Sequence, residues 1–204
     1  MNSISKYISS QFKNPRGLMG VIISMIQNIV NNKMYKKTAS LVDIKSDEQY
    51  LDIGYGNGHL LKLIYKKKMI DMYGIDISED AKKMAKKKNR KADKLGNLHL
   101  QVGDCCNLPY DDDFFSAITS INTIYFWEDT IKGLSEIRRC LKAGKSFYNV
   151  VYTREYLDTI RYTQIGYKKF NEEQLIEFGK VAGFRTVDVK EISKGKSFVI
   201  IYTK

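Results

Sequence analysis

From residue 48 onward, short apolar runs alternate with segments of helical periodicity, and this alternation narrows the possible folds more than any other feature of the sequence. Strands are predicted at residues 49–53, 70–75, 98–102, 117–121, 147–152, 186–192 and 197–202, and helices at 58–68, 79–94, 130–141 and 172–181. Such alternation with short connections indicates βαβ units and a mostly parallel sheet with helices on both faces. The last two strands form a hairpin around Lys194-Gly195, so at least one edge of the sheet is expected to be antiparallel.

The segment 153–170 is the longest one without periodicity after the first strand. It follows the C-terminal end of a predicted strand. Because open α/β sheets bind their ligands at that end, the segment is expected to form a loop beside a substrate.

The first forty-five residues carry a different pattern. Apolar residues between Leu18 and Val30 recur at helical spacing, which predicts one or two helices that lie on an apolar surface. This stretch is shorter than the roughly 20 apolar residues that a membrane-spanning helix needs, and no small-residue cleavage site follows it. Neither a membrane span nor a targeting segment is therefore predicted. The chain divides into an N-terminal helical cap, 1–45, and a main domain, 46–204.

The sequence holds 34 basic and 23 acidic residues, a net charge of +11. This balance permits contact with nucleic acid or an anionic membrane without requiring it. The basic residues between 82 and 94 spread around a helix rather than along one stripe, which favours a solvated helix face. Cys105, Cys106 and Cys140 include an adjacent pair and no Cys-x-x-Cys motif, so we expect no disulfide framework, no metal site and a cytoplasmic location.

The sharpest motif is the loop from Asp52 to Gly58, which directly follows the first predicted strand and opens a helix. Glycines at 54, 56 and 58 permit positive φ angles and let a ligand approach the backbone closely. The first N–H groups of the following helix are free to bind a polar ligand group. The Gly-x-Gly-x-Gly spacing differs from the Gly-x-Gly-x-x-Gly dinucleotide motif, which disfavours an NAD-binding oxidoreductase.

Two further carboxylates follow the second and third predicted strands. Asp76 ends the second strand, where a carboxylate can accept hydrogen bonds from both hydroxyls of a ribose. Asp104 follows the third strand in Gly103-Asp104-Cys105, where a carboxylate can accept a hydrogen bond from an adenine amino group. Because consecutive parallel strands end at one edge of a sheet, the glycine loop and the two carboxylates predict a single ligand site.

These motifs together resemble those of the class I S-adenosylmethionine-dependent methyltransferases, of the small-molecule, type 11-like kind. The resemblance is carried by the loop Asp52 to Gly58, by Asp76, by Gly103-Asp104, and by segments 112–118, 121–129 and 141–145. It covers residues 48–150 by motif and reaches the C-terminus by element order. One departure is the turn Lys142-Ala143-Gly144-Lys145, where the family commonly has proline and a second glycine.

The resemblance implies a Rossmann-like three-layer α/β sandwich, with a seven-stranded sheet whose last strand is antiparallel and an N-terminal helical cap. It implies S-adenosyl-L-methionine as cofactor, S-adenosyl-L-homocysteine as product, and residues 46–204 as the cofactor-binding domain. Asp52 and the loop glycines would hold the methionine end, and the backbone at Asn122 its amino group. Asp76 would hold the ribose, and Asp104 with Cys105 the adenine. The implied cofactor-binding residues are Asp52, Gly54, Tyr55, Gly56, Gly58, Asp76, Ile77, Asp104, Cys105 and Asn122.

Methyl transfer from a sulfonium is an in-line displacement of an activated methyl group, so the protein mainly orients donor and acceptor in a dry pocket. A general base is needed only if the acceptor loses a proton. His59 is one candidate, although a polar residue at a helix start is the more ordinary interpretation. Tyr125 and Trp127 are candidates for the wall of the acceptor pocket, as are Arg16 and Tyr35 from the N-terminal segment. No residue is assigned as catalytic.

The N-terminal helix is expected to bury its apolar stripe, since each large apolar side chain gains roughly 1.5–3 kcal/mol from burial. The pocket mouth is the apolar surface that the other helices leave uncovered. Residues 12–35, with a turn at 14–17, would then form a lid that excludes water and gates binding. A fixed structural cover or a subunit interface is the alternative.

A small-molecule acceptor is favoured over two other readings of the same site. An amino-directed nucleic-acid methyltransferase would resemble Asn-Pro-Pro-Tyr after the fourth strand, where this chain has Asn122-Thr123-Ile124-Tyr125. No separate RNA-binding module fits in 204 residues. A non-catalytic cofactor-binding module is excluded by no sequence feature. A monomer or homodimer is expected, and no motif identifies the acceptor.

Overall fold

A seven-stranded β-sheet organises residues 17–204, the part of the chain that this computed structural model describes. The strands lie in the order β3-β2-β1-β4-β5-β7-β6. Their bounds are β1 Gln49–Ile53, β2 Asp71–Asp76, β3 Leu98–Val102, β4 Phe115–Ile121, β5 Leu141–Tyr152, β6 Thr186–Ser193 and β7 Ser197–Thr203. Strand β7 runs antiparallel to both β5 and β6, and the other pairs are parallel, so six strands share one direction. The mostly parallel sheet with an antiparallel last strand is confirmed.

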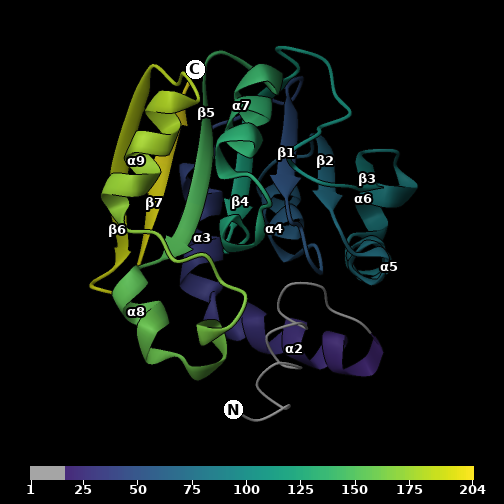
Figure 1. Cartoon of the computed structure of the whole chain (residues 1–204). Helices are drawn as coiled ribbons and strands as arrows, with labels where there is room; N and C mark the ends of the chain where they lie inside the picture. Colours follow the sequence, from purple (N-terminus) through teal and green to yellow (C-terminus); the bar gives the residue numbers. More distant parts are fainter. Residues whose placement is uncertain (1–16) are drawn as a thin grey trace.

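Helices cover both faces of the sheet, which confirms the three-layer sandwich. The helices are α2 Gly17–Val30, α3 Asn32–Leu41, α4 His59–Lys67, α5 Glu79–Lys88, α6 Arg90–Lys94, α7 Thr130–Cys140, α8 Arg154–Thr159 and α9 Glu172–Val181, with short 3-10 helices η1 Ile124–Phe126 and η2 Arg161–Gln164. Helices α7 and α9 lie in front of the sheet in Figure 1, and α3 and α4 lie behind it. Each layer buries its own apolar cluster, with Leu134 and Leu175 in front and Leu60 and Leu61 behind. The sheet is therefore held from both sides.

The helix predicted over 79–94 is interrupted at Asn89. Asn89 is buried, and its side-chain amide donates hydrogen bonds to the carbonyl oxygens of Gly58 (2.9 Å) and Ala85 (3.0 Å). An asparagine side chain that bonds to main-chain groups competes with the helical hydrogen-bond pattern. Helix α5 therefore ends at Lys88, and the bond to Gly58 ties this break to the start of α4.

The segment 153–170, expected to be an irregular loop, contains α8 and η2. The Tyr156 N–H donates to the Thr153 hydroxyl at 3.1 Å, which caps α8, and the Thr163 hydroxyl donates to the Leu157 carbonyl at 2.5 Å. The six residues of α8 are too few to display a helical apolar period, so periodicity alone missed them.

Strand β5 begins at Leu141, earlier than the predicted start at residue 147. Leu141 pairs with Phe115, and the register then shifts before Ser146 pairs with Ala117. The intervening residues include Gly144, which has a φ of +72°. Residues 141–145, which were predicted as the end of a helix and the turn after it, therefore form the irregular beginning of β5.

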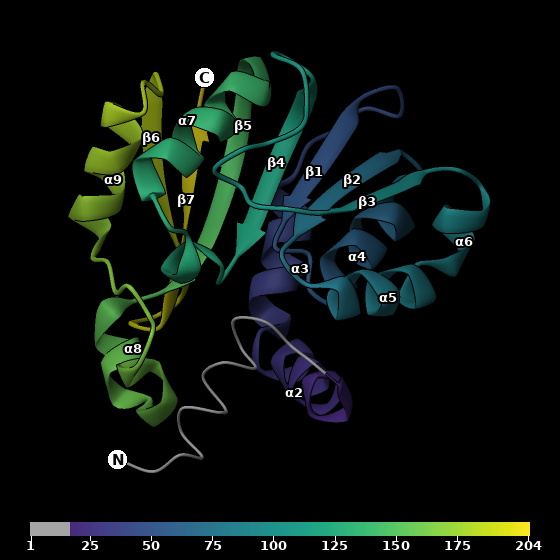
Figure 2. The same cartoon turned by 45° about the vertical axis from the view of Figure 1, so that its right-hand side comes forward.

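Helix α2 lies beyond the C-terminal ends of the parallel strands, as does α8 (Figures 1 and 2). Its buried positions are Gly20, Ile23 and Ser24, which share one face at helical spacing. The Asn57 side-chain amide donates to the Ser24 carbonyl at 3.0 Å on that face. Other apolar side chains of α2 remain 43% to 78% exposed: Met19, Ile22, Met25, Ile26, Ile29 and Val30. The expected burial of the apolar stripe is therefore wrong for these six residues, because Ile23 contacts the domain together with the small residues Gly20 and Ser24.

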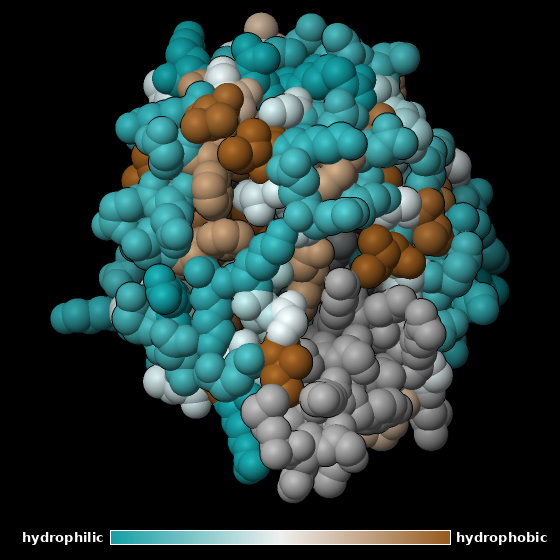
Figure 3. All heavy atoms as spheres, viewed as in Figure 1, coloured by the Kyte–Doolittle hydropathy of each residue, from teal (hydrophilic) through white to brown (hydrophobic). Residues whose placement is uncertain are grey.

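Exposed apolar side chains are concentrated on α2. They account for six of the twelve large apolar side chains found exposed within residues 17–204. Hydrophilic side chains cover most of the face drawn in Figure 3. No helix in this described part of the chain has both the length and the apolar character needed to cross a membrane.

Strand β1 ends in a sharp turn at Gly54, which has a φ of +67°. The Gly54 N–H donates to the Ile75 carbonyl on β2 at 2.7 Å. A Cβ at this position would collide with the Thr123 side chain, which follows β4. Glycine is therefore required both for the left-handed backbone and for the close approach to Thr123.

Replacing Gly54 by alanine should lower the free energy of unfolding by about 2–4 kcal/mol, since backbone strain of about 1–2 kcal/mol adds to the collision with Thr123. Gly96→Ala is the matched control, because Gly96 also has a positive φ (+78°) but open space where its Cβ would lie. Chemical denaturation of both variants measures the difference. Equal losses would show that the contact with Thr123 contributes nothing.

Candidate functional site

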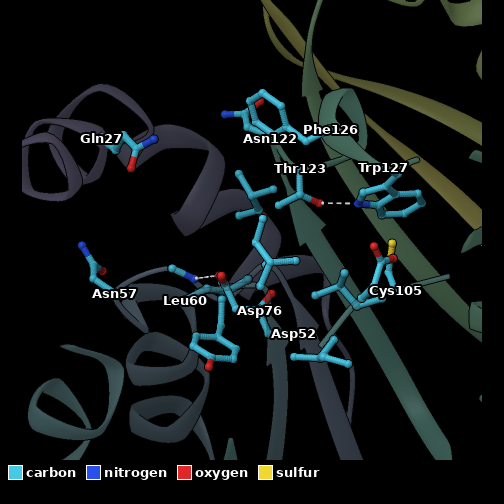
Figure 4. A pocket seen from close by; sticks show the side chains of 18 of the residues that line it. Gln27, Asp52, Asn57, Leu60, Asp76, Cys105, Asn122, Thr123, Phe126 and Trp127 are labelled. Atoms are coloured by element: carbon cyan, nitrogen blue, oxygen red, sulfur yellow. Dashed lines mark hydrogen bonds between the residues drawn. The ribbon is translucent and has the colours of Figure 1, made fainter. Parts of the chain in front are cut away.

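A cavity lies at the C-terminal ends of the central strands, and its empty space, with the open solvent at its mouth included, is about 1030 Å³. Open α/β sheets bind ligands at this edge, where the strand order reverses between β1 and β4. In Figure 4, Asp52 and Asp76 lie on one side of this cavity, and Asn122 and Phe126 on the other. Nine of the ten predicted cofactor-binding residues line it: Asp52, Gly54, Tyr55, Gly56, Asp76, Ile77, Asp104, Cys105 and Asn122.

Gly58 is the tenth, and the structure places it outside the cavity lining. It precedes α4 with a φ of +73°, and a Cβ there would press on Asn89 and Ala85 of the α5 region. The third glycine of the motif thus allows α4 to approach α5, while the first two shape the cavity.

Asp52 lies on β1 with 3% of its surface exposed. The Thr119 hydroxyl donates to its Oδ1 at 2.8 Å, and the Tyr50 hydroxyl lies 2.6 Å from that of Thr119. Burial raises the pKa of the Asp52 carboxyl to about 7, although the bond from Thr119 lowers it and the Asp76 charge raises it further. A carboxyl group with this pKa ionises readily when a cationic group approaches it.

Asp76 ends β2 and holds the glycine loop against this strand by a hydrogen bond. Its carboxylate accepts hydrogen bonds from the Gly56 N–H at 2.9 Å and the Ser78 N–H at 3.0 Å. Burial raises the pKa of Asp76, and these N–H donors oppose the rise. A Cβ on Gly56 would meet nothing within 4 Å, so the loop backbone faces open cavity there.

Beyond β3, the cavity wall is formed by Asp104 and Cys105, with Trp127 beside them. The Asp104 carboxylate accepts a hydrogen bond from the Cys106 N–H at 2.7 Å, which shapes the turn. The Trp127 indole donates to the Thr123 hydroxyl at 3.2 Å (Figure 4). The predicted adenine-binding pair therefore lies on the same cavity as Asp52 and Asp76.

Potential metal-ligand atoms of Asp104, Cys105 and Cys106 lie within 4.8 Å of one another. No such ligand cluster is predicted from the sequence, because the motif Cys-x-x-Cys is absent. Three protein ligands are fewer than the four of a structural zinc site. Burial raises the pKa of the Cys105 thiol, which disfavours the thiolate that a metal requires.

Asn122 connects the two sides of the site. Its φ of +58° is one of only two positive values at non-glycine residues within 17–204. The Asn122 N–H donates to the Val150 carbonyl at 2.9 Å, and its side-chain oxygen accepts a hydrogen bond from the Tyr125 hydroxyl at 3.2 Å. A left-handed backbone at a residue other than glycine is uncommon, and such residues cluster at ligand sites.

The N-terminal helices supply a wall that sequence reasoning identified only in part. Gln27, Asn31 and Tyr35 all line the cavity: Gln27 lies on α2, Asn31 at the junction of the two helices and Tyr35 on α3, so both helices contribute to this wall. Of these, Tyr35 was a candidate, whereas Gln27 and Asn31 were missed. Their signal was present as amide side chains that interrupt the apolar stripe at helical spacing. The candidate Arg16 lies outside the described residues.

His59, the candidate general base, begins α4 but does not line the cavity. Its ring packs edge-on against Tyr35, with the ring centroids 4.9 Å apart. Burial lowers the pKa of His59, and the Lys88 charge lowers it further. The structure therefore supports a packing role for this histidine.

A second cavity of about 820 Å³ lies between α2 and the segment 153–170. It adjoins the first, because Gln27, Asn31, Asn122 and Phe126 line both. The two aromatic candidates for the acceptor wall lie in different cavities: Tyr125 lines the second cavity and Trp127 lines the first.

Comparison with known proteins identifies the family of this chain. The model of the family described as "Methyltransferase domain" matches residues 51–149. The "Putative methyltransferase YrhH" of Bacillus subtilis is 31% identical over 125 residues, which cover 57% of this chain and 68% of that protein. The "Uncharacterized methyltransferase YdaC" of the same species is 26% identical over 171 residues, which cover 83% of this chain and 90% of that protein.

A solved structure shares the fold. It is that of a putative S-adenosyl-L-methionine-dependent methyltransferase from Methanococcus maripaludis, with a TM-score of 0.71 and 22% identity. The match covers 91% of this chain and 90% of that one. The motifs of the sequence, the family model and these relatives agree, and the chain therefore belongs to the methyltransferase-domain family as an S-adenosyl-L-methionine-dependent methyltransferase.

Proposed function

We propose that this methyltransferase acts on a small-molecule acceptor, held in the second cavity, with S-adenosyl-L-methionine held in the first. The observation that carries this proposal is the shared wall between the two cavities, formed by Asn31, Asn122 and Phe126 together with Gln27. A methyl donor and an acceptor must lie in contact and in line for transfer, and the adjacency of the two cavities supports such an arrangement. We name the second cavity the acceptor chamber.

The residues of the first cavity fit the cofactor. The buried carboxyl of Asp52 suits a cationic group, and that of Asp76, already fixed by two N–H donors, suits the ribose hydroxyls. At Gly56 the space that a Cβ would fill is open, so the ligand can contact the loop backbone. Asp104 and Cys105 would contact the adenine, and the Asn122 backbone the methionine amino group.

When bound, the cofactor supplies a methyl group already activated by its sulfonium charge. The chain's own contribution is orientation and exclusion of water. Within residues 17–204, neither cavity is lined by a histidine or a lysine that could take a proton from the acceptor. We therefore assign no general base. This agrees with the expectation from the sequence that a base is needed only for an acceptor that loses a proton.

A small molecule is preferred to a nucleic acid as acceptor. No lysine or arginine among the described residues lines either cavity. Proteins that bind nucleic acids use such side chains to neutralise phosphates, and their binding weakens steeply with salt. We retain a monomer or homodimer and a cytoplasmic location as predictions.

The function is tested by incubating the protein with S-adenosyl-L-methionine labelled with tritium in its methyl group and a metabolite extract. We expect label in the small-molecule fraction and none in RNA or DNA. In Asp76→Ala, affinity for S-adenosyl-L-homocysteine should fall by about 1.5–3 kcal/mol, the usual loss for a hydrogen bond to a charged group, and transfer should fall with it.

Calorimetric titration measures that affinity, with Asp188→Ala as the control because Asp188 is an exposed carboxylate on β6. Wild-type affinity in Asp76→Ala would refute the ribose assignment. Label appearing chiefly in nucleic acid would overturn the choice of acceptor.

Cofactor binding should depend on the ionisation of Asp52. With the pKa of Asp52 raised to about 7, part of the empty protein is protonated at neutral pH, and a bound cation favours the ionised form. Affinity for S-adenosyl-L-methionine should therefore rise between pH 6 and 8, with protons released on binding. Calorimetry in buffers of different ionisation enthalpy counts those protons, and Asp52→Asn should release none from this site.

The same pKa sets a stability trend for the empty protein. The folded chain holds the Asp52 proton more tightly than the unfolded chain, where the pKa is near 3.8, so the free energy of unfolding should fall as pH rises from about 4 to 7. Asp52→Asn should lessen this fall and be the more stable protein at pH 8. An unchanged pH profile in the variant would contradict the assignment.

We also propose that α2 and the start of α3 act as a lid over the cofactor. The hydrogen bond from Asn57 to the Ser24 carbonyl joins α2 to the glycine loop, and Asn31 accepts a hydrogen bond from the Tyr152 hydroxyl at 2.5 Å. S-adenosyl-L-homocysteine should therefore slow amide hydrogen exchange in residues 20–35. Exchange in α9 serves as the internal control. High and unchanged protection in α2 would indicate a fixed cover instead.

A further inference from the structure

Among residues 17–204, the side chains that line the acceptor chamber are uncharged. The fourteen described lining residues comprise ten aliphatic or aromatic side chains and four neutral polar ones, Gln27, Asn31, Asn122 and Thr163. Transfer of a charged group into such surroundings is strongly unfavourable unless a partner compensates the charge. No such partner is present among the described residues that line the chamber, so the chamber selects against ionised acceptors.

The polar groups of the chamber are not evenly spread. Gln27, Asn31 and Asn122 belong to the wall shared with the cofactor cavity. Apart from Thr163, whose hydroxyl donates to the Leu157 and Ile160 carbonyls, the remaining wall is aliphatic or aromatic and includes the side chains of Leu157 and Ile160. A molecule that matches this distribution has one polar end beside the cofactor and an apolar body directed away from it.

The tyrosine hydroxyls nearest that wall are already bonded within the protein. The Tyr125 hydroxyl donates to the Asn122 side chain, and it accepts a hydrogen bond from the Tyr152 N–H at 2.6 Å. The Tyr152 hydroxyl donates to the Asn31 side chain. Burial raises the pKa of both phenols, so they stay neutral and supply no counter-charge for a cation.

The apolar wall continues to the outside of the molecule along α2. Ile26 and Val30 line the chamber while more than half of each side chain is exposed. Ile22, Met25 and Ile29 extend the exposed apolar surface along the same helix. Exposed apolar side chains therefore continue from the chamber wall along α2.

We propose that the acceptor is a neutral, predominantly apolar molecule whose single polar, methyl-accepting end lies beside Asn31 and Asn122 and whose apolar body lies between α2 and the α8–η2 segment. This inference rests on the proposed role of the second cavity as the acceptor site. It narrows the acceptor from any small molecule to lipid-like compounds without an ionised group.

The charge preference is tested by displacement of the neutral dye Nile red from the protein saturated with S-adenosyl-L-homocysteine. The competitors are dodecanol, dodecanoate and dodecylammonium, which share one chain length and differ in head-group charge. The two ions are kept below their micelle concentrations and dodecanol below its solubility limit. Dodecanol should displace the dye at a concentration at least about tenfold lower than either ion, because the chamber offers an ion no partner. Stronger displacement by dodecylammonium would indicate an aromatic site for cationic amines and overturn the proposal, as would stronger displacement by dodecanoate.

Variants locate the dye. Ile160→Glu places a carboxylate in the apolar part of the chamber and should weaken Nile red binding about tenfold, whereas Ile160→Gln, of similar size, should weaken it less. Val181→Glu is the matched control, since Val181 is an exposed apolar residue on α9. Val30→Glu provides a second test from α2 if Ile160→Glu does not fold. Equal weakening by the chamber variants and by Val181→Glu would show that the dye binds the general surface, and would refute the proposal.

Two further readouts separate this inference from the proposed function. Affinity for S-adenosyl-L-homocysteine should be unchanged in Ile160→Glu, because Ile160 does not line the cofactor cavity. The transferred tritium label should partition into an organic solvent when the extract is separated into apolar and water-soluble fractions. Absence of cofactor binding by the wild-type protein would defeat the proposed function itself. Transfer of label to a charged, water-soluble acceptor would defeat only the acceptor class.

Discussion

Parallel strands that end at one level make the site possible. The first N–H after β1, at Gly54, donates to the Ile75 carbonyl, and that after β3, at Gly103, donates to the Asp76 carbonyl. The N–H of Asn122, after β4, donates to the Val150 carbonyl in the same way. Each chain segment thus completes one more inter-strand bond and then turns away from the sheet. Because the turns begin at a common edge, carboxyl groups from separate strands converge on one cavity.

This convergence is unfavourable for the empty protein. Asp52 and Asp76 are both removed from water, and burial raises the pKa of each. The Thr119 hydroxyl and the N–H groups of Gly56 and Ser78 offset part of the electrostatic cost. In the function we propose, a cationic methyl donor would supply the remaining compensation, so the groups that weaken the empty fold would strengthen the complex. Cofactor-binding sites commonly trade stability for function in this manner.

The N-terminal segment completes the site in an unusual orientation. Helix α2 turns Gly20, Ile23 and Ser24 toward the domain and leaves its larger apolar side chains outside. Amides at Gln27 and Asn31 then face both cavities. An apolar helix face that the protein does not use for its own packing is available to a partner or ligand. The uncharged acceptor chamber beside it gives that face a use in our proposal.

The sequence by itself determined the sheet, its antiparallel last strand and the strand-end wall of the first cavity, where nine of the ten predicted residues lie. These features depend on short-range signals, since alternating strands and helices fix the topology and strand-end residues such as Asp52, Asp76 and Asp104 reach the common edge through it. Only the tertiary structure decided how Gly58 is used, because its neighbour Asn89 is thirty-one positions away. It also decided which face of α2 meets the domain and which residues of 153–170 oppose it. Apolar periodicity predicts a helix with two faces but contains no information about which surface each face will meet, since that choice depends on contacts between segments more than one hundred residues apart, such as Asn31 and Tyr152.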